Sequence, residues 1–203
     1  MTIGVVIPAY RSADTLARTI ESCLPHVDPH DIVVVLDGPD DEAEKAARGA
    51  CAGLRILVLP RQSGAPVCRN EGLALIDTDY VMFMDADDYI EGSLLEGASC
   101  VADARGADVV LSPFCFEMPD GTRRSCDPYA RYVSFDRDTI IGTWLVGGYT
   151  PPCAVLWRTK FVRDIGGWDE SLAKNQDGDL MYRALLHGAQ VAASSEGLGV
   201  YVQ

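Results

Sequence analysis

Two aspartates separated by one residue follow an apolar segment near the middle of the chain. Residues 80–84 are predicted to form a strand, and Asp85, Ala86 and Asp87 come directly after it. Side chains at positions i and i+2 of an extended backbone project to the same side, so Asp85 and Asp87 are expected to converge, while Ala86 leaves room for close packing. Carboxylate oxygens favour Mg²⁺ or Mn²⁺. The motif alone fits equally well a turn or a helix N-cap.

Further candidate residues follow the other predicted strands. Pro8, Ala9 and Tyr10 come after a strand over 3–7, and Asp37 comes after a strand over 32–36. In open α/β sheets, ligands bind beyond the carboxyl ends of the strands, where these residues are expected to meet the aspartate pair. Each has a structural alternative: Pro8 ends a ladder, Tyr10 is a half-buried aromatic residue, and Asp37 closes a turn.

Two residues farther along the chain have chemistry that suits the same site. Arg69 lies on a predicted helix, where its forked donors could reach a phosphate or carry surface charge. Asp177 lies just before the last helix, where it is either an N-cap or a general base, and a helix N-terminus favours the ionised carboxylate that both roles need.

Strand and helix patterns alternate through residues 1–117. Helices are expected after Asp14 and over 41–52, 65–76 and 93–104, and further strands over 55–59 and 108–116. This alternation predicts a mostly parallel sheet covered on both faces. Residues 118–203 are mixed, with a turn at 118–122, helices over 135–146 and 178–187, and a strand over 154–158. We therefore expect one α/β domain over 1–203, whose first half binds a nucleotide and whose second half, 118–203, binds an acceptor.

Composition restricts the partners and the compartment. The 203 residues are 48% hydrophobic, with a formal net charge of -13, which suits one substantial core and argues against a nucleic-acid partner. The seven cysteines show no C-x-x-C pair, and Cys23 and Cys100 are expected on apolar helix faces. No run of about 18 apolar residues occurs. A soluble cytoplasmic protein is expected, with peripheral membrane association left open.

Five segments resemble, in order and spacing, the motif series of glycosyltransferase family 2. They are VVIPAY at 5–10, VVVLDG at 33–38, RNEG at 69–72, FMDADD at 83–88, and GGWDE at 166–170 with QD at 176–177. The resemblance implies the GT-A fold, with a Rossmann-like nucleotide-binding half. It also implies inverting sugar transfer from a nucleotide-diphosphate sugar, most often a UDP-sugar, to an acceptor hydroxyl, with Mn or Mg as cofactor.

The same resemblance implies a role for each candidate residue. Asp37 is similar to the aspartate that recognises the base, and Pro8, Ala9 and Tyr10 to the wall around the nucleobase and ribose. Arg69 resembles an arginine near the nucleotide. Asp87 resembles the direct metal ligand, and Asp85 a contact of the ribose or the metal. Asp177 matches the catalytic base.

The acceptor side is less defined by the sequence. Trp168 could be a platform for an acceptor sugar beside Asp169, although a core tryptophan fits equally well. The acceptor is expected to be a glycan or a lipid-linked sugar, as in cell-surface glycan synthesis. No Q-x-x-R-W segment follows Asp177, so a processive synthase is not expected.

The chain departs from the family pattern at Leu36 and Gln176, where relatives commonly have acidic residues. Two other functions fit parts of the sequence. A sugar-phosphate nucleotidyltransferase shares a similar core but needs a glycine-rich basic loop after the first strand, where this chain has Pro8-Ala9-Tyr10-Arg11-Ser12. A nucleotide-sugar binding module without turnover would bind the donor and transfer nothing.

Overall fold

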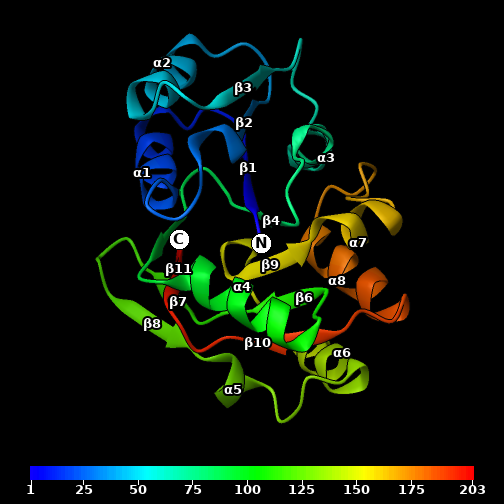
Figure 1. Ribbon diagram of the computed structural model, residues 1–203. Helices are drawn as coiled ribbons and strands as arrows, with labels where there is room; N and C mark the ends of the chain where they lie inside the picture. Colours follow the sequence, from blue (N-terminus) through cyan, green and yellow to red (C-terminus); the bar gives the residue numbers. More distant parts are fainter.

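The computed structural model describes residues 1–203 and contains two β-sheets, the larger of which has helices on both faces (Figure 1). The larger sheet has seven strands in the order β10-β6-β9-β4-β1-β2-β3. Their bounds are Ile3–Ala9 (β1), Ile32–Leu36 (β2), Arg55–Val58 (β3), Tyr80–Phe83 (β4), Val109–Leu111 (β6), Val155–Arg158 (β9) and Val191–Ala193 (β10). Only β9 is antiparallel to its neighbours, which confirms the predicted mostly parallel sheet.

Alternate side chains of the central strand β1 enter two separate cores. Val5 and Ile7 pack with helices α1 (Ala13–Cys23), α2 (Asp41–Ala50) and α4 (Leu94–Arg105). Val6 lies on the opposite face of the sheet. That face is covered by four helices, α3 (Ala65–Leu75), α6 (Arg137–Leu145), α7 (Thr159–Asp164) and α8 (Gln176–Leu186). A strand buried on both faces explains the continuous apolar run in β1.

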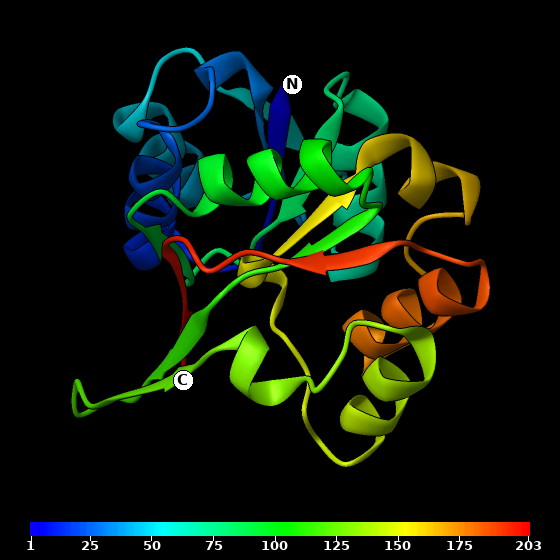
Figure 2. The same ribbon diagram turned by 60° about the horizontal axis from the view of Figure 1, so that its bottom comes forward.

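A smaller four-stranded sheet lies beside the larger one (Figure 2). Its order is β5-β11-β7-β8, with bounds Tyr89–Glu91, Leu198–Val202, Phe114–Glu117 and Arg123–Cys126. Strands β7 and β8 pair antiparallel around the predicted 118–122 turn. Short helical turns at Pro29–Asp31 (η1), Pro128–Arg131 (α5) and Pro152–Ala154 (η2) complete the chain.

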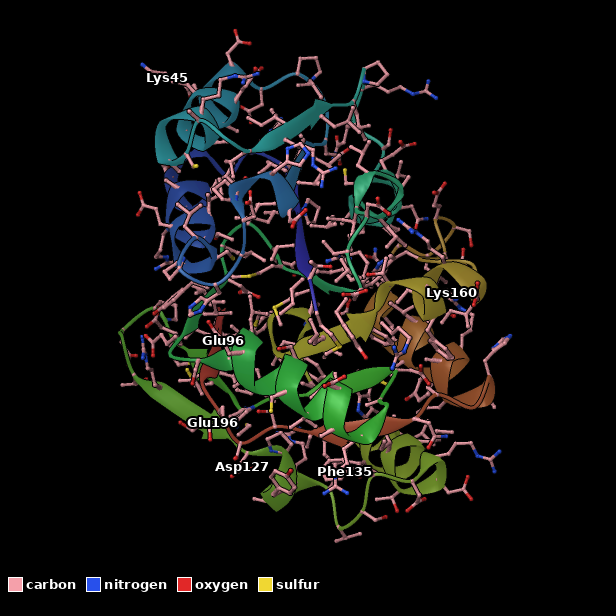
Figure 3. All side chains as sticks on the ribbon, in the orientation of Figure 1. Lys45, Glu96, Asp127, Phe135, Lys160 and Glu196 are labelled. Carbon is pink, nitrogen blue, oxygen red and sulfur yellow. The ribbon has the colours of Figure 1, made fainter.

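Helix α3 approaches the sheet very closely because residue 72 is glycine. A Cβ at Gly72 would lie 2.3 Å from the Val6 Cγ1 atom, so no side chain fits there without moving the helix. Elsewhere side chains fill the space between the layers, and the labelled Lys45 of α2 and Lys160 of α7 lie at the outside of the molecule (Figure 3). No helix has the length and apolar character needed to cross a membrane.

Four sequence expectations need correction. The strand expected over 108–116 is two strands in different sheets, because Ser112-Pro113 interrupts it and proline cannot donate a ladder hydrogen bond. Helix α1 is preceded by Ser12 as its N-cap, and Asp14 lies in its first turn. Cys100 is exposed, whereas Cys23 is buried as expected. The strand expected to extend to residue 84 ends at Phe83, which changes the geometry of the aspartate pair.

Candidate active site

A cavity of about 390 Å³ lies at the carboxyl ends of β1, β2 and β4. Seven sequence-predicted residues line it: Pro8, Ala9, Tyr10, Asp37, Asp85, Ala86 and Asp87. Pro8 and Ala9 are the last residues of β1, which is two residues longer than the strand expected over 3–7, and the other five lie in the loops after β1, β2 and β4. These segments meet because the parallel strands end at the same edge of the sheet. The cavity thus lies where the central strand β1 and its two sheet neighbours, β2 and β4, all end.

Asp37 follows β2 and is 7% exposed. Its Oδ1 atom accepts hydrogen bonds from the backbone N–H of Ser63 at 2.6 Å and of Gly64 at 3.2 Å, and its Oδ2 atom accepts from Gly64 at 3.0 Å. These bonds fix the loop before α3 against the end of β2. Asp37 therefore shapes one wall of the cavity, in addition to presenting its carboxylate there.

The Asp85–Asp88 segment forms a turn, with the Asp88 N–H donating to the Asp85 carbonyl at 3.1 Å. The sequence predicted that an extended backbone would project the Asp85 and Asp87 side chains to the same side. The backbone is a turn instead, although both side chains do line the cavity. Side chains of helix α1 donate hydrogen bonds to the backbone of this turn. The buried Thr19 hydroxyl donates to the carbonyls of Ala86 (2.9 Å) and Asp88 (2.6 Å), and Arg18 donates to that of Asp87 (2.9 Å).

The oxygens at the tip of this turn are available to a cation. The Asp87 side chain is exposed and accepts no hydrogen bond from another residue, and Asp85 uses only its Oδ1 atom, toward Arg69. No group of three His, Cys, Asp or Glu side chains is arranged to hold a metal without further ligands. The free oxygens of Asp85 and Asp87 fit Mg²⁺ or Mn²⁺, which usually bind through one or two carboxylates together with substrate phosphates and water.

Arg69 lies behind the cavity and is only 4% exposed. Its Nη2 atom donates to Asp85 Oδ1 at 2.5 Å, its Nη1 atom donates to Gln176 Oε1 at 3.0 Å, and its guanidinium lies 4.3 Å from the Trp168 ring centroid. It does not line the cavity. Its role near the nucleotide stays a prediction from the sequence.

Asp177 lies in the first turn of α8, whose N-cap is Asn175. Burial, and to a smaller extent the Asp85 carboxylate, raise the pKa of Asp177 to about 6, while Arg69 opposes the shift. No hydrogen bond from another side chain stabilises its charge. A partly desolvated carboxylate with free oxygens at a helix N-terminus is suited to accept a proton.

The two residues expected on the acceptor side lie in different surroundings. Trp168 is 3% exposed and packs edge-on against Phe83, with ring centroids 5.1 Å apart, so its burial favours the core alternative. Asp169 is exposed and accepts hydrogen bonds from the Ser171 N–H and hydroxyl at 2.9 and 2.6 Å. These bonds lower the pKa of Asp169 and shape its loop.

Sequence reasoning missed several residues at the site. Arg11 lines the cavity with a positive φ of 50°, and Cys68 lines it from the first turns of α3. Ser12, Thr15 and Ala65 complete the lining. A usable signal for Cys68 was its position one residue before Arg69 on a predicted helix. No local pattern marked Thr19, because its partners lie 67 and 69 residues away.

Comparison with known proteins finds relatives named for sugar transfer and for polysaccharide biosynthesis. It is 28% identical over 200 residues to the pre-mycofactocin glycosyltransferase of Mycobacterium tuberculosis, covering 93% of this chain and 40% of that protein. It is 28% identical over 202 residues to the succinoglycan biosynthesis protein ExoU of Rhizobium meliloti, covering 93% of this chain and 58% of that protein. The chain therefore spans about half the length of these relatives.

Solved structures share the fold. The crystal structure of S. aureus TarS residues 1–349 in complex with UDP matches with a TM-score of 0.78 and 21% identity, covering 98% of this chain and 60% of that one. A TarS complex with UDP-GlcNAc matches with the same TM-score and identity, covering 98% and 58%. These matches confirm the expected GT-A architecture. The model of glycosyl transferase family 2 matches residues 4–163, and the chain belongs to that family.

Proposed function

We propose that the chain is an inverting, metal-dependent, non-processive glycosyltransferase that moves a sugar from a nucleotide-diphosphate donor to an acceptor hydroxyl. One observation carries this proposal above the others. The cavity gathers Asp37, Asp85 and Asp87 at one sheet edge, and Arg69 connects Asp85 to the helix turn that bears Asp177. The proposed donor site and the proposed proton acceptor would therefore be neighbours, as direct displacement at the anomeric carbon requires.

The donor proposed is a uridine diphosphate sugar. Family membership supports a nucleotide-sugar donor, and the matching TarS structures contain UDP and UDP-GlcNAc. Pro8, Ala9, Tyr10 and Asp37 would enclose the nucleobase and ribose, with Ala86 permitting close approach. Asp87, with Asp85, would hold Mn²⁺ or Mg²⁺, which supplies positive charge to stabilise the departing diphosphate.

Asp177 is proposed to act as the general base. Its carboxylate would take the proton from the acceptor hydroxyl while the oxygen attacks the anomeric carbon on the face opposite the diphosphate. One displacement on that face inverts the anomeric configuration. The acceptor is proposed to be a glycan or lipid-linked sugar, because ExoU is named for succinoglycan biosynthesis.

A panel of nucleoside diphosphates tests the donor assignment. The melting temperature of the chain would be measured with UDP, GDP, CDP and ADP, with the corresponding triphosphates and with UDP-sugars, each with Mn²⁺, with Mg²⁺ and with chelator, and UDP release from the UDP-sugars would be followed. A ligand that binds only the native state raises the melting temperature. A rise that needs both UDP and a cation supports the proposal. A rise with nucleoside triphosphates in place of diphosphates would favour a nucleotidyltransferase, and binding of UDP-sugars without any UDP release would favour a binding module.

A further inference from the structure

Arg69 joins three parts of the site that are far apart in the sequence. It lies on α3, its Nη2 atom bonds Asp85 in the turn after β4, and its Nη1 atom bonds Gln176 at the start of α8. Its planar face stacks on Trp168 at 4.3 Å. Gln176 directly precedes the proposed base Asp177. One guanidinium thus contacts a proposed metal ligand and the residue beside the proposed base.

Two of the three guanidinium nitrogens are committed to these contacts. Arg69 is 4% exposed, does not line the cavity, and its Nε atom is buried without a partner. A buried charge is tolerated only when it is paired, and its one carboxylate partner is Asp85. Turning the side chain toward a nucleotide would break that pair and leave Asp85 without its only side-chain partner.

A guanidinium is suited to this connection in a way that an ammonium group is not. Its donors have a fixed planar arrangement, so two acceptors on opposite elements are held at a set separation while the flat face packs on an aromatic ring. A lysine at this position could reach one acceptor at a time. The glutamine at 176 accepts through Oε1 without adding a second negative charge beside Asp85.

We propose that Arg69 is a positioning residue that fixes the metal-binding turn relative to the first turn of α8, and that it makes no contact with the nucleotide. The proposal rests on the proposed function, because it gives Asp85 and Asp177 their roles. In this proposal Arg69 acts by holding Asp85 and α8 in place and does not bind the phosphates of the nucleotide. Removing Arg69 should therefore weaken what the metal contributes to binding and leave nucleotide binding without metal unchanged.

The affinity of UDP with and without Mn²⁺ separates the two roles. Calorimetric titrations of wild type and Arg69→Lys would be made in Mn²⁺ and in chelator. We expect the lysine variant to lose about tenfold or more of the Mn²⁺-dependent gain in UDP affinity, since a charge-assisted hydrogen bond no longer orients Asp85. Affinity in chelator should stay the same. An equal loss in both conditions would show that Arg69 contacts the nucleotide and would overturn the proposal.

Gln176 tests the second half of the connection and does not depend on the Arg69 variant folding. In wild type, UDP with Mn²⁺ should slow amide hydrogen exchange in a peptide covering 174–182, because ordering Asp85 orders Arg69 and then Gln176. Gln176→Leu should bind UDP and Mn²⁺ normally but lose this slowing, and Gln176→Glu should restore it. Protection that survives in Gln176→Leu, or that is absent in wild type that binds UDP with Mn²⁺, would overturn the connection.

Arg163→Lys is the matched control. Arg163 also donates to backbone groups of the α3 region, with Nη2 bonding the Leu73 carbonyl at 2.9 Å, but it touches neither Asp85 nor Gln176. Its replacement should lower the melting temperature and leave both the Mn²⁺-dependent UDP affinity and the exchange pattern unchanged. Absence of UDP binding by wild type under every condition would instead contradict the proposed function itself.

Discussion

The four aspartates of the site differ in how many of their oxygens are free. Asp37 is bonded by two backbone N–H groups, and Asp85 is bonded by Arg69, whereas Asp87 and Asp177 accept no hydrogen bond from another side chain. Free carboxylate oxygens are the ones that can hold a cation or take a proton. The division of labour proposed for the site therefore follows from the hydrogen-bond pattern.

Replacing Asp177 by asparagine is expected to separate binding from chemistry. The amide has nearly the same shape but cannot accept the acceptor proton, so release of UDP from the sugar donor should fall by orders of magnitude. The affinity for UDP with Mn²⁺ should stay close to that of wild type. If Asp177→Asn turned over near the wild-type rate, Asp177 would not be the general base, and its role would be a structural one at the helix terminus.

The raised pKa of Asp177 predicts the acid limb of the activity profile. With a pKa of about 6, the carboxylate is protonated below that pH and cannot act as a base, so kcat/KM should fall as the pH drops through about 6. The same shift means that ionising Asp177 destabilises the fold as the pH rises from about 4 to about 6. Asp177→Asn should therefore gain resistance to denaturant at pH 7, and a loss of resistance would contradict the shift.

Asp87→Ala is expected to remove the Mn²⁺-dependent part of UDP affinity. Asp87 bonds to no other side chain, and burial and the Asp85 carboxylate raise its pKa, so Asp87→Ala should not lower the free energy of unfolding. Calorimetry and urea denaturation measure the two quantities. Asp103→Ala, an exposed aspartate on α4, serves as the control and should change neither. Unchanged Mn²⁺ dependence in Asp87→Ala would reassign the metal ligand.

At the scale of elements, the buried Thr19 hydroxyl of helix α1 supports the Asp85–Asp88 turn. Thr19→Val keeps the shape of the side chain but leaves the carbonyls of Ala86 and Asp88 without this donor. We expect a loss of about 1–3 kcal/mol in the free energy of unfolding, together with weaker Mn²⁺-dependent UDP binding. Thr19→Ser should retain most of both. Normal UDP affinity in a destabilised Thr19→Val would show that the turn does not need α1.

The packing of α3 against β1 gives a second prediction for elements. An alanine at Gly72 would place its Cβ against Val6 and push the helix outward, so Gly72→Ala should cost about 1–3 kcal/mol in urea denaturation. Gly142, in the middle of α6, has nothing within 4 Å of an added Cβ. Gly142→Ala should stabilise the chain by up to about 1 kcal/mol. Equal effects of the two substitutions would contradict the close approach of α3.

Element by element, the sequence was informative where one segment carries its own periodicity. The β-branched run of β2 was recognisable because a strand buried on both faces is continuously apolar. The amphipathic helices α1 and α2 were recognisable because their buried residues recur every three to four positions. The short strands β5, β10 and β11 were missed, since three to five residues paired with distant partners carry no local period. The break at Pro113 does have a local signal, because proline cannot donate a ladder hydrogen bond.

At the scale of the whole molecule, the donor half of the site could be predicted and the acceptor half could not. Parallel strands must end at one edge, so Tyr10, Asp37 and Asp85 could be placed together from their positions after strands. Helix α8 contacts α3 through the Arg69–Gln176 hydrogen bond across 107 residues and packs its apolar face in a core shared with distant elements, and no local pattern encodes either. The antiparallel strand β9 and the second sheet, which position that half, depend on equally distant pairings.

The net charge of the molecule favours the proposed binding of a cation at the cavity. The chain carries a net charge of -13, and the cavity presents three aspartates and one arginine, so a diphosphate meets net repulsion there. A divalent cation held by Asp87 would reverse the local field at the phosphates. The site should consequently bind a nucleoside diphosphate poorly unless the cation is present.

Calorimetric titration of the wild-type chain with UDP, in Mn²⁺ and again in excess chelator, tests this conclusion most directly. We predict saturable binding of one UDP per chain in Mn²⁺, with affinity at least about tenfold lower in chelator. Equal affinity in the two conditions would contradict a metal-dependent donor site at Asp85 and Asp87, and absence of binding in both would contradict the donor itself.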